Sequence, residues 1–258
     1  MKIATWNINS LTVRLAQVID WLTANPVDAL CLQELKLTDE KFPYAAFEAI
    51  GYSSAVFGQK TYNGVAILSR IPATGIVKNI TRFPDEQSRV ITATLGTPGG
   101  DLRLINGYFV NGQEPGSDKF AYKMNWLNGL QAMVKNELAA YPRLVLVGDF
   151  NITFDDRDTY DAEGLVETIH HTTAERDHFK ALLALGMTDA FRLFEQPEKS
   201  YSWWDYREFA FRRNRGLLID RILVSDALKP LVTSCVIDKT PRKNERPSDH
   251  TPVIVELC

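Results

Sequence analysis

Polar side chains of the kinds that bind cations and carry protons stand at the ends or in the middle of several apolar segments. They are Asn7, Glu34, Asp149, Asn151, Asp220, Asp249 and His250. Asp220 lies inside the apolar run 217–224, where an ionised carboxylate is costly unless it has a partner. Taken singly, an Asp or Asn after a strand is commonly a turn residue, and a buried Asp is commonly half of a structural ion pair. Their recurrence on separate strand-like segments indicates a carboxylate-lined metal cleft.

The donor atoms of this set favour a hard divalent cation. Carboxylate and amide oxygens suit Mg²⁺ or Mn²⁺, whereas zinc sites usually take more His and Cys ligands. Three widely separated cysteines, Cys31, Cys235 and Cys258, indicate neither a thiolate zinc site nor a disulfide framework. Hydrolysis of a phosphodiester needs an activated water, neutralised phosphoryl charge and a stabilised leaving oxygen, and these side chains could cover those tasks. The residues alone therefore predict a metal-dependent hydrolase, with phosphoesters as candidate substrates.

Short apolar runs and amphipathic helices must position these groups. Buried strands are predicted at 2–7, 28–33, 64–69, 102–108, 143–148, 217–224 and 252–257. Helical spacing of apolar residues predicts one helix around residues 15–22 and a second around residues 127–138. A third helix is predicted to begin near Thr172, which has capping-box spacing to Glu175. The segments 155–172 and 204–216 are polar or irregular and are predicted to be long surface loops. We expect one domain over residues 1–258.

Composition limits the class of protein. The chain has 258 residues, of which 45% are hydrophobic and 24% charged, with a formal net charge of −3. This balance argues against a passive DNA coat protein, which is usually strongly basic. Two basic segments are each either a local DNA-facing rim or ordinary solvated charge. One contains Arg207, Arg212, Arg213, Arg215 and Arg221, and the other contains Arg242, Lys243 and Arg246. The sequence contains no transmembrane run and no signal peptide, so we expect a cytoplasmic protein without a membrane partner.

Longer motifs link the polar residues to a known family. They are Trp6–Leu11 (WNINSL), 32–36 (LQELK), 62–66 (YNGVA), 106–112 (NGYFVNG), 148–152 (GDFNI), 186–192 (GMTDAFR), 202–207 (SWWDYR), 214–220 (NRGLLID) and 246–253 (RPSDHTPV). In this order and spacing, the sequence resembles the exonuclease III branch of the endonuclease/exonuclease/phosphatase superfamily along essentially its whole length. It is most similar to the bacterial AP endonucleases of that branch.

The resemblance implies an α/β fold, a four-layer α/β/β/α sandwich of two packed mixed sheets flanked by helices, with the active site at one end of the sheets. It implies Glu34 as the principal ligand of Mg²⁺ or Mn²⁺. The rest of the implied ligand set is Asn7, Asp149, Asn151, Asp249 and His250. The implied catalytic residues are Tyr108, Asp149, Asn151, Asp220 and His250.

Individual roles also follow from the resemblance. Asp220 is expected to orient His250, and adjacent Asp249 is a poor candidate because neighbouring side chains in extended backbone point to opposite sides. Asn111, Asn151 and His250 are expected to bind the scissile phosphate. Two readings of His250 stay open: it is the base, or it binds the phosphate as an imidazolium while Asp149 activates the water. One- and two-metal mechanisms are both compatible with the motifs.

The resemblance also implies a substrate. An apolar pocket at Trp203, Leu217 and Ile219 would accept a flipped-out abasic sugar, although such residues are commonly plain core. The residues expected to contact the DNA backbone are Lys36, Arg207, Arg212, Arg213 and Arg215. The expected reactions are hydrolysis of double-stranded DNA 5′ to abasic sites leaving a 3′-hydroxyl, removal of 3′-blocking groups, and 3′→5′ exonuclease digestion, all by a monomer. A phospholipid, phosphoinositide or RNA substrate, or a catalytically silent scaffold, are the alternatives.

Overall fold

The computed structural model describes residues 1–258, and its strands form two six-stranded sheets. The first sheet has the order β11-β12-β1-β2-β4-β3, and the second has the order β5-β6-β7-β8-β10-β9. The strands of the first sheet are β1 (Lys2–Asn7), β2 (Ala29–Gln33), β3 (Ser53–Phe57), β4 (Val65–Ser69), β11 (Val232–Ile237) and β12 (Val253–Leu257). Those of the second are β5 (Ala73–Lys78), β6 (Val90–Thr97), β7 (Gly100–Tyr108), β8 (Leu144–Asp149), β9 (Met187–Asp189) and β10 (Asp220–Ser225). Parallel pairing of β1 with β2 and of β7 with β8 makes both sheets mixed.

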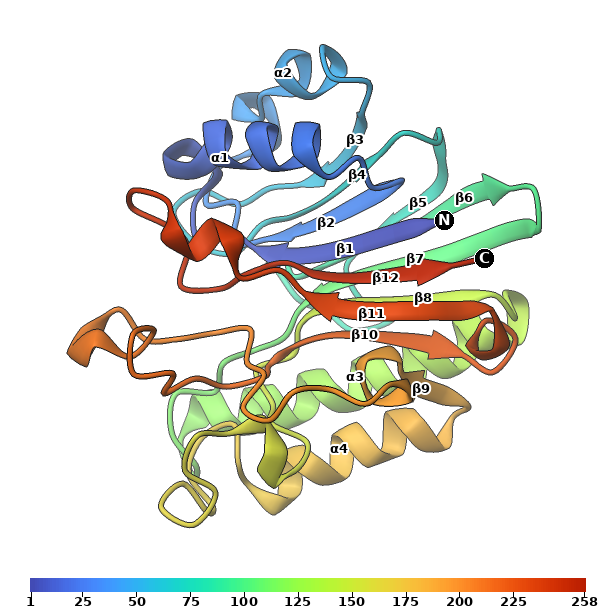
Figure 1. Cartoon of the computed structure of the whole chain (residues 1–258). Helices are drawn as coiled ribbons and strands as arrows, with labels where there is room; N and C mark the ends of the chain where they lie inside the picture. The colour runs from blue at the N-terminus through green and yellow to red at the C-terminus, as the bar shows by residue number, and fades with distance from the viewer.

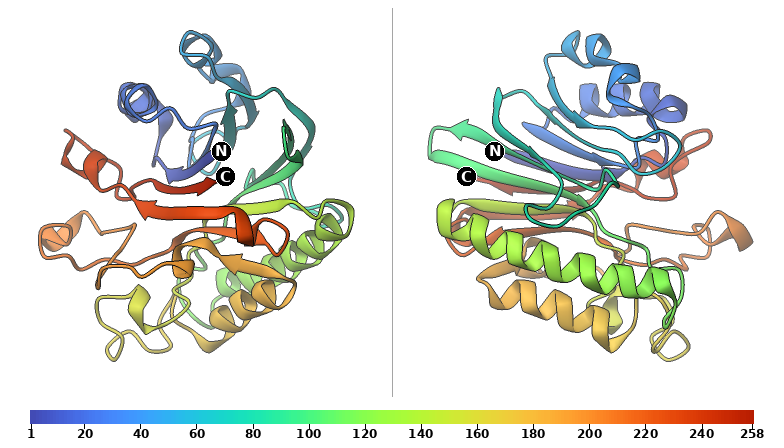
Figure 2. Two further views of the ribbon diagram at one scale, coloured as in Figure 1. Left: turned by 45° about the vertical axis from the view of Figure 1, so that its right-hand side comes forward. Right: turned by 180° about the vertical axis from the view of Figure 1, so that it is seen from behind.

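The two sheets pack face to face, and helices cover their outer faces (Figure 1). Helices α1 (Leu11–Ala24) and α2 (Tyr44–Glu48) cover the first sheet. Helices α3 (Asp118–Ala140) and α4 (Thr173–Ala184) lie side by side against the second sheet in both views of Figure 2. The predicted four-layer α/β/β/α sandwich is confirmed. No helix is long and apolar enough to cross a membrane.

Alternation along the central strands explains the layers, because successive side chains of a strand point to opposite faces. In β2, Ala29 and Cys31 join the core between the sheets, whereas Leu30 and Leu32 join the core beneath α1 and α2. Central strands are therefore apolar on both faces, which produces the continuous apolar runs of the sequence. The core between the sheets contains residues from both, as one domain requires, and the assignment of residues 1–258 to one domain stays a prediction.

The predicted elements are present, and the largest shift of a strand boundary is in the strand predicted at 217–224. All seven predicted strands are found, and the Thr172–Glu175 capping box starts α4. The strand predicted at 217–224 was wrong at its start, because β10 begins at Asp220. Residues 217–219 are apolar, but Leu217 pairs by isolated bridges with Thr159 and Trp203 instead of extending the sheet. The strands β3, β5, β6, β9 and β11 were not predicted.

Candidate active site

Three adjacent strands of the second sheet bring three polar side chains into line. Tyr108 at the end of β7 is paired with Asp149 at the end of β8, and Asp149 is paired with Asp220 at the start of β10. All three share the strand face that turns toward the first sheet. Gly148 allows β8 to approach β7 closely here, since a Cβ at this position would lie 1.8 Å from the carbonyl oxygen of Gly107. The register therefore builds one wall of a polar site.

The first sheet supplies the opposite wall. Asn7 ends β1, and its amide nitrogen donates to Glu34 Oε1 at 2.9 Å and to Asp149 Oδ2 at 3.0 Å, which links the two sheets. Glu34 follows β2 with a φ of 54°, in the left-handed region that non-glycine residues rarely adopt. Tyr108 donates its hydroxyl to Glu34 Oε1 at 3.0 Å. The ends of β1, β2, β7 and β8 thus converge on the Glu34 carboxylate.

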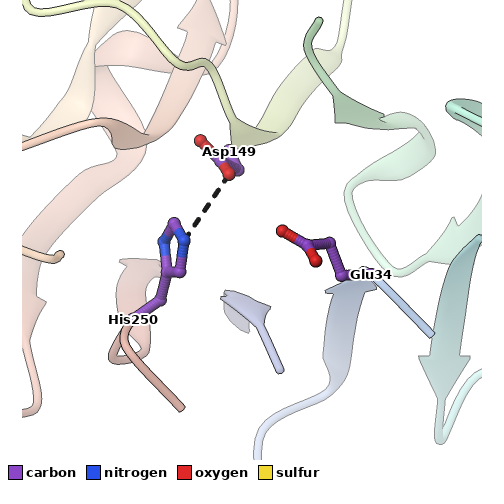
Figure 3. Close-up of side chains that lie close together, drawn as sticks. All are labelled: Glu34, Asp149 and His250. Carbon is purple, nitrogen blue, oxygen red and sulfur yellow. Dashed lines mark ion pairs between the residues drawn. The ribbon is translucent and has the colours of Figure 1, made fainter. Parts of the chain in front are cut away.

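His250, which precedes β12, is held by Asp220. Its Nδ1 lies 2.9 Å from Asp220 Oδ2, and the same oxygen accepts the Ser202 hydroxyl at 2.6 Å. Nδ1 lies within hydrogen-bond distance of both carboxylate oxygens of Asp220, so Nδ1 is the donor of this contact and carries a proton. The other ring nitrogen, Nε2, faces Asp149 Oδ2 at 3.7 Å (Figure 3). The expected pair of His250 and Asp220 is therefore present, and it turns Nε2 toward the cavity.

Charges in this closed space shift the protonation of both partners. Burial raises the pKa of Asp149 to about 7, and the nearby carboxylates of Asp220 and Glu34 add to this rise against the charge of His250. Burial lowers the pKa of His250, but the carboxylates of Asp220 and Asp149 outweigh it and raise the pKa to about 10. At neutral pH the imidazole is therefore protonated, whereas Asp149 can take up or release a proton.

Two further groups at the cavity have fixed protonation. Burial and the charges of Glu34 and Asp149 raise the pKa of Tyr108 well above its ordinary value, so the phenol stays a neutral donor. Burial raises the pKa of Asp249, but the charge of His250 and hydrogen bonds from Asn9 and Trp203 outweigh it and lower the pKa. Asp249 is thus an ionised carboxylate at neutral pH.

The donor atoms suit a divalent cation. One side-chain atom each from Glu34, Asp149 and His250 lies within 4.8 Å of the others (Figure 3). The protonated ring of His250 offers no lone pair to a cation, so it could be a ligand only after losing a proton. Carboxylate oxygens dominate the group, as Mg²⁺ and Mn²⁺ prefer. Asn7 turns its side-chain amide nitrogen toward Glu34 and Asp149. Its side-chain oxygen accepts a hydrogen bond from the backbone N–H of Asn9 at 3.0 Å. Ligation by Asn7 would therefore require its amide to rotate.

A cavity of about 180 Å³ lies between these groups. Its lining residues are Glu34, Tyr108, Asn111, Asp149, Asn151, His170, Trp203, Ile219, Asp249 and His250. Of the three residues expected to form an apolar pocket, Trp203 and Ile219 line the cavity. Leu217 does not, although its backbone pairs with that of Trp203. The indole Nε1 of Trp203 donates to Asp249 Oδ2 at 3.0 Å, so this aromatic wall is anchored to the acidic group.

His170 is a lining residue that the sequence did not indicate. Its Nδ1 lies 2.7 Å from the carbonyl oxygen of Asn151, and its Nε2 lies 3.5 Å from the Asn111 amide nitrogen. Burial, with the charge of Lys123, lowers the pKa of His170 to about 3, so the ring is neutral and Nδ1 donates to the carbonyl. No spacing signal marks this residue, because it belongs to the irregular segment 155–172 and reaches the cavity only when that loop folds back.

The basic residues expected to contact DNA differ in whether they are exposed or already form ion pairs. Arg212 and Arg213 are exposed. The inclusion of Arg221 and Arg242 in the candidate basic rims was wrong, because both are buried and Arg221 is used in ion pairs with Asp158 and Asp189. Arg207 pairs with Asp205 at 2.7 Å, and Arg215 pairs with Glu208 at 3.1 Å. Lys36 is drawn into the site, because its ammonium lies 2.9 Å from Glu34 Oε2. A second hydrogen bond, 2.6 Å long, joins the same ammonium to the side-chain oxygen of Asn9. Lys36 thus balances the charge of Glu34.

Two further depressions adjoin the cavity. One of about 560 Å³ shares Tyr108 and Asn111 with it and extends to Tyr62, Arg89 and Lys119. The other, of about 340 Å³, shares Trp203 and reaches several residues of the loop after it, among them Arg207 and Arg215. A ligand larger than the cavity could therefore extend into neighbouring depressions.

Fold and site together define a hydrolase with an acidic cavity suited to a divalent cation and a phosphate. Residues 4–250 match the model of the Endonuclease/Exonuclease/phosphatase family. The chain is 35% identical over 266 residues to exodeoxyribonuclease III of Haemophilus influenzae, with 100% of both chains covered. The chain therefore belongs to the endonuclease/exonuclease/phosphatase family, and within it to the exonuclease III-type nucleases.

Solved structures agree with this placement. The 3′ phosphatase NExo from Neisseria, bound to a product DNA hairpin, matches with a TM-score of 0.96 and 46% identity, covering 100% of this chain and 99% of that one. A structure of NExo from Neisseria meningitidis, described as a 3′-5′ exonuclease, matches with a TM-score of 0.96 and 47% identity over the same shares. An AP endonuclease from Archaeoglobus fulgidus matches with a TM-score of 0.94 and 34% identity, again covering 100% and 99%.

Proposed function

We propose that this chain is a DNA-repair phosphoesterase that acts on duplex DNA with the help of Mg²⁺. It removes phosphate groups and nucleotides from 3′ ends and cuts the phosphodiester 5′ to abasic sites, leaving a 3′-hydroxyl. The convergence of Glu34, Asp149, Asn151 and His250 on one cavity carries the proposal. The neighbouring depressions would receive the strand. We expect a monomer that works in the cytoplasm, with residues 1–258 as one domain.

Glu34 and Asp149 would hold the cation, with Asp249 and Asn151 close by along the cavity wall. When bound, the cation neutralises charge that develops on the phosphoryl oxygens. Asn111 and Asn151 would position the phosphate by hydrogen bonds from their side-chain amides. Tyr108, which stays protonated, would donate a hydrogen bond to the phosphate by turning its hydroxyl away from Glu34. These contacts fix the reacting phosphorus relative to the attacking water.

The two titrating groups take different parts in the reaction. The pKa of Asp149 is about 7 in the cation-free protein, and its ionised carboxylate is suited to accept the proton of the attacking water. His250, with a pKa of about 10, remains an imidazolium and is suited to bind a phosphoryl oxygen through Nε2–H. Asp220 holds the imidazolium in this orientation through Nδ1. We therefore assign the base to Asp149 and the phosphate contact to His250.

We propose that this chain processes 3′ ends faster than it cuts DNA at abasic sites. The chain is 46–47% identical to the structures described as a 3′ phosphatase and a 3′-5′ exonuclease, but 34% identical to the AP endonuclease from Archaeoglobus fulgidus. Trp203 and Ile219 would form the wall that meets the deoxyribose at the cut.

Three labelled duplexes test the proposal side by side. One carries a 3′-phosphate, one a recessed 3′-hydroxyl end, and one an internal tetrahydrofuran that mimics an abasic site. Each is incubated with Mg²⁺, with Mn²⁺ and with EDTA. We expect cation-dependent release of phosphate and shortening from the 3′ end, with slower incision at the tetrahydrofuran. Faster incision at the tetrahydrofuran would reverse the order, and no cation-dependent reaction on any duplex would refute the proposal.

A further inference from the structure

Lys123 is a fully buried lysine on α3, and its ammonium reaches two loops of the candidate active site. Its Nζ donates to the carbonyl oxygen of Asn111 at 3.1 Å and to that of Asn151 at 2.8 Å. A third donor goes to Glu175 Oε1, which is also buried. An ammonium has three protons, so all of its donors are used inside the protein.

The two carbonyls belong to the asparagines whose side chains line the cavity. Asn111 follows β7 and Asn151 follows β8, so neither is held by the ladder of its sheet at this point. Asn151 has a φ of 49°, a conformation that needs support from its surroundings. Its amide nitrogen donates to the carbonyl of Phe109 at 3.1 Å, and its side-chain oxygen lies 3.4 Å from the Asn111 amide nitrogen. Because the Lys123 ammonium binds the backbone carbonyls of both asparagines, it fixes the backbone from which both amide side chains extend.

Glu175 extends the arrangement to a third segment. Its Oε1 accepts the backbone N–H of His170 at 3.1 Å, and its Oε2 accepts the backbone N–H and the hydroxyl of Thr172. The ring of His170 in turn contacts the same Asn151 carbonyl that Lys123 contacts. One buried ion pair thus ties together the loops after β7 and β8 and the loop before α4.

We propose that Lys123, compensated by Glu175, is a positioning residue that sets the phosphate-binding geometry of Asn111 and Asn151. The inference rests on the proposed function. Lys123 does not line the cavity, so it acts through the asparagines and touches no substrate. Close packing supports a fixed geometry, because a Cβ at Gly112 would lie 2.9 Å from Lys123 Cδ. Displacement of catalytic groups by about 1 Å can cost about 10²-fold in rate.

The experiment compares Lys123→Met, Lys123→Arg and the neutral double variant Lys123→Met/Glu175→Gln with the wild type. Arg103→Met is the matched control, because Arg103 is buried and pairs with Glu137 at 2.7 Å away from the cavity. Folded fraction is measured by circular dichroism, and kcat and KM are measured on the duplex with a 3′-phosphate. We expect about a 10²-fold fall in kcat per folded molecule for the Lys123 variants, and little change in kcat for Arg103→Met.

A double-mutant cycle with Asn151→Ala separates positioning from general stability. If Lys123 acts through Asn151, adding Lys123→Met to Asn151→Ala costs much less than it costs alone. Fully multiplicative effects, or an unchanged kcat in the neutral double variant, would overturn the inference. If Lys123→Met and the neutral double variant do not fold, Lys123→Arg decides in their place, because it keeps the charge but cannot reproduce the ammonium geometry. A wild type without cation-dependent hydrolysis would instead refute the proposed function.

Discussion

Strand β10 carries two buried charged clusters on its opposite faces. Asp220 turns toward the other sheet and the active site, while Arg221 turns toward α4 and binds Asp158 and Asp189. In the Arg221 cluster, Arg192 gives Asp158 a second cationic partner. In the active site, the carboxylates of Glu34, Asp149, Asp220 and Asp249 have only Lys36 and His250 as salt-bridge partners. The first cluster is electrically complete, and the second has room for a positive ion.

This difference separates a structural role from a catalytic one. A buried ion pair whose partners are satisfied holds segments together, and its loss is felt in stability. A cluster with excess negative charge is unfavourable by itself and gains from a cation or from protonation. The raised pKa of Asp149 is the expected sign of such an excess. Variants on the two faces of β10 should therefore affect different measurements.

The largest effect is expected from the complete cluster. Arg221→Met leaves Asp158 and Asp189 buried with fewer partners, so the free energy of unfolding should fall by about 3–5 kcal/mol. Urea denaturation followed by circular dichroism measures this loss. The kcat of the remaining folded enzyme should be largely retained. A loss of kcat without a loss of stability would contradict the structural role of this face.

His250→Asn on the other face should give the opposite result. Removal of one strong electrostatic donor to a developing charge costs about 10²–10³-fold in kcat. The variant should fall by this amount on the 3′-phosphate duplex, with a smaller loss of stability than Arg221→Met. The same two measurements apply to both variants. Equal stability losses with an unchanged kcat would remove His250 from the mechanism.

Cation binding to the active-site carboxylates should stabilise the folded state, and the Arg221 cluster should take no part in this gain. At a Mg²⁺ concentration about 100 times its dissociation constant, the folded state should gain about 2.7 kcal/mol. This gain should appear in thermal melts of the wild type and of Arg221→Met. Glu34→Ala should lose much of it and need more Mg²⁺ for activity. Wild-type turnover of Glu34→Ala at low Mg²⁺ would refute Glu34 as a ligand.

The smallest expected effect is the release of a proton when Mg²⁺ binds. In the cation-free protein Asp149 has a pKa of about 7, so at pH 6 most molecules carry a proton there, and at pH 8 most do not. Because a ligand carboxylate must be ionised, Mg²⁺ binding should release a proton at pH 6 and much less at pH 8. Apparent affinity should accordingly rise with pH through this range. Titration calorimetry in two buffers of different ionisation enthalpy measures the release, and Asp149→Asn should abolish it.

The sequence predicted most of the central strands because their burial is visible in composition. Segments such as β8 are apolar on both faces, whereas β5 and β11 lie at sheet edges, where β5 is largely exposed and β11 partly exposed, so their residues carry no clear pattern. Strand β6 is central and buried but was missed, because Thr92 and Thr94 interrupt its apolar run. Strand β9 has three residues, too few for any periodicity. The strand predicted at 217–224 began too early. Leu217 is apolar but pairs with Trp203 through an isolated bridge, and apolar composition does not distinguish such a bridge from pairing within a sheet.

For the site, residues at strand ends were predictable from their position, and the loop residues Asn111 and Trp203 were found only through the resemblance. His170 and Lys123 were not found at all. Glu34 and Asp149 follow apolar runs, and the ends of neighbouring strands meet at one edge of a sheet. His170 depends on a loop that folds back through Glu175. Lys123 lies on an amphipathic helix, where a lysine is normally exposed, and its burial depends on three partners from distant segments. Such placements need the tertiary structure.

The order in which the chain is synthesised determines when this nuclease can first act in a cell. Strand β12 pairs with β1, and the residues just before it, Asp249 and His250, complete a site whose other walls lie far earlier in the chain. A ribosome adds about 5–20 residues per second, so roughly 10–40 s separate the synthesis of Glu34 from that of His250. In the second half of this interval the emerging chain contains Glu34 and Asp149 but still lacks the imidazolium. Translation itself therefore delays hydrolytic activity until the last strand is made.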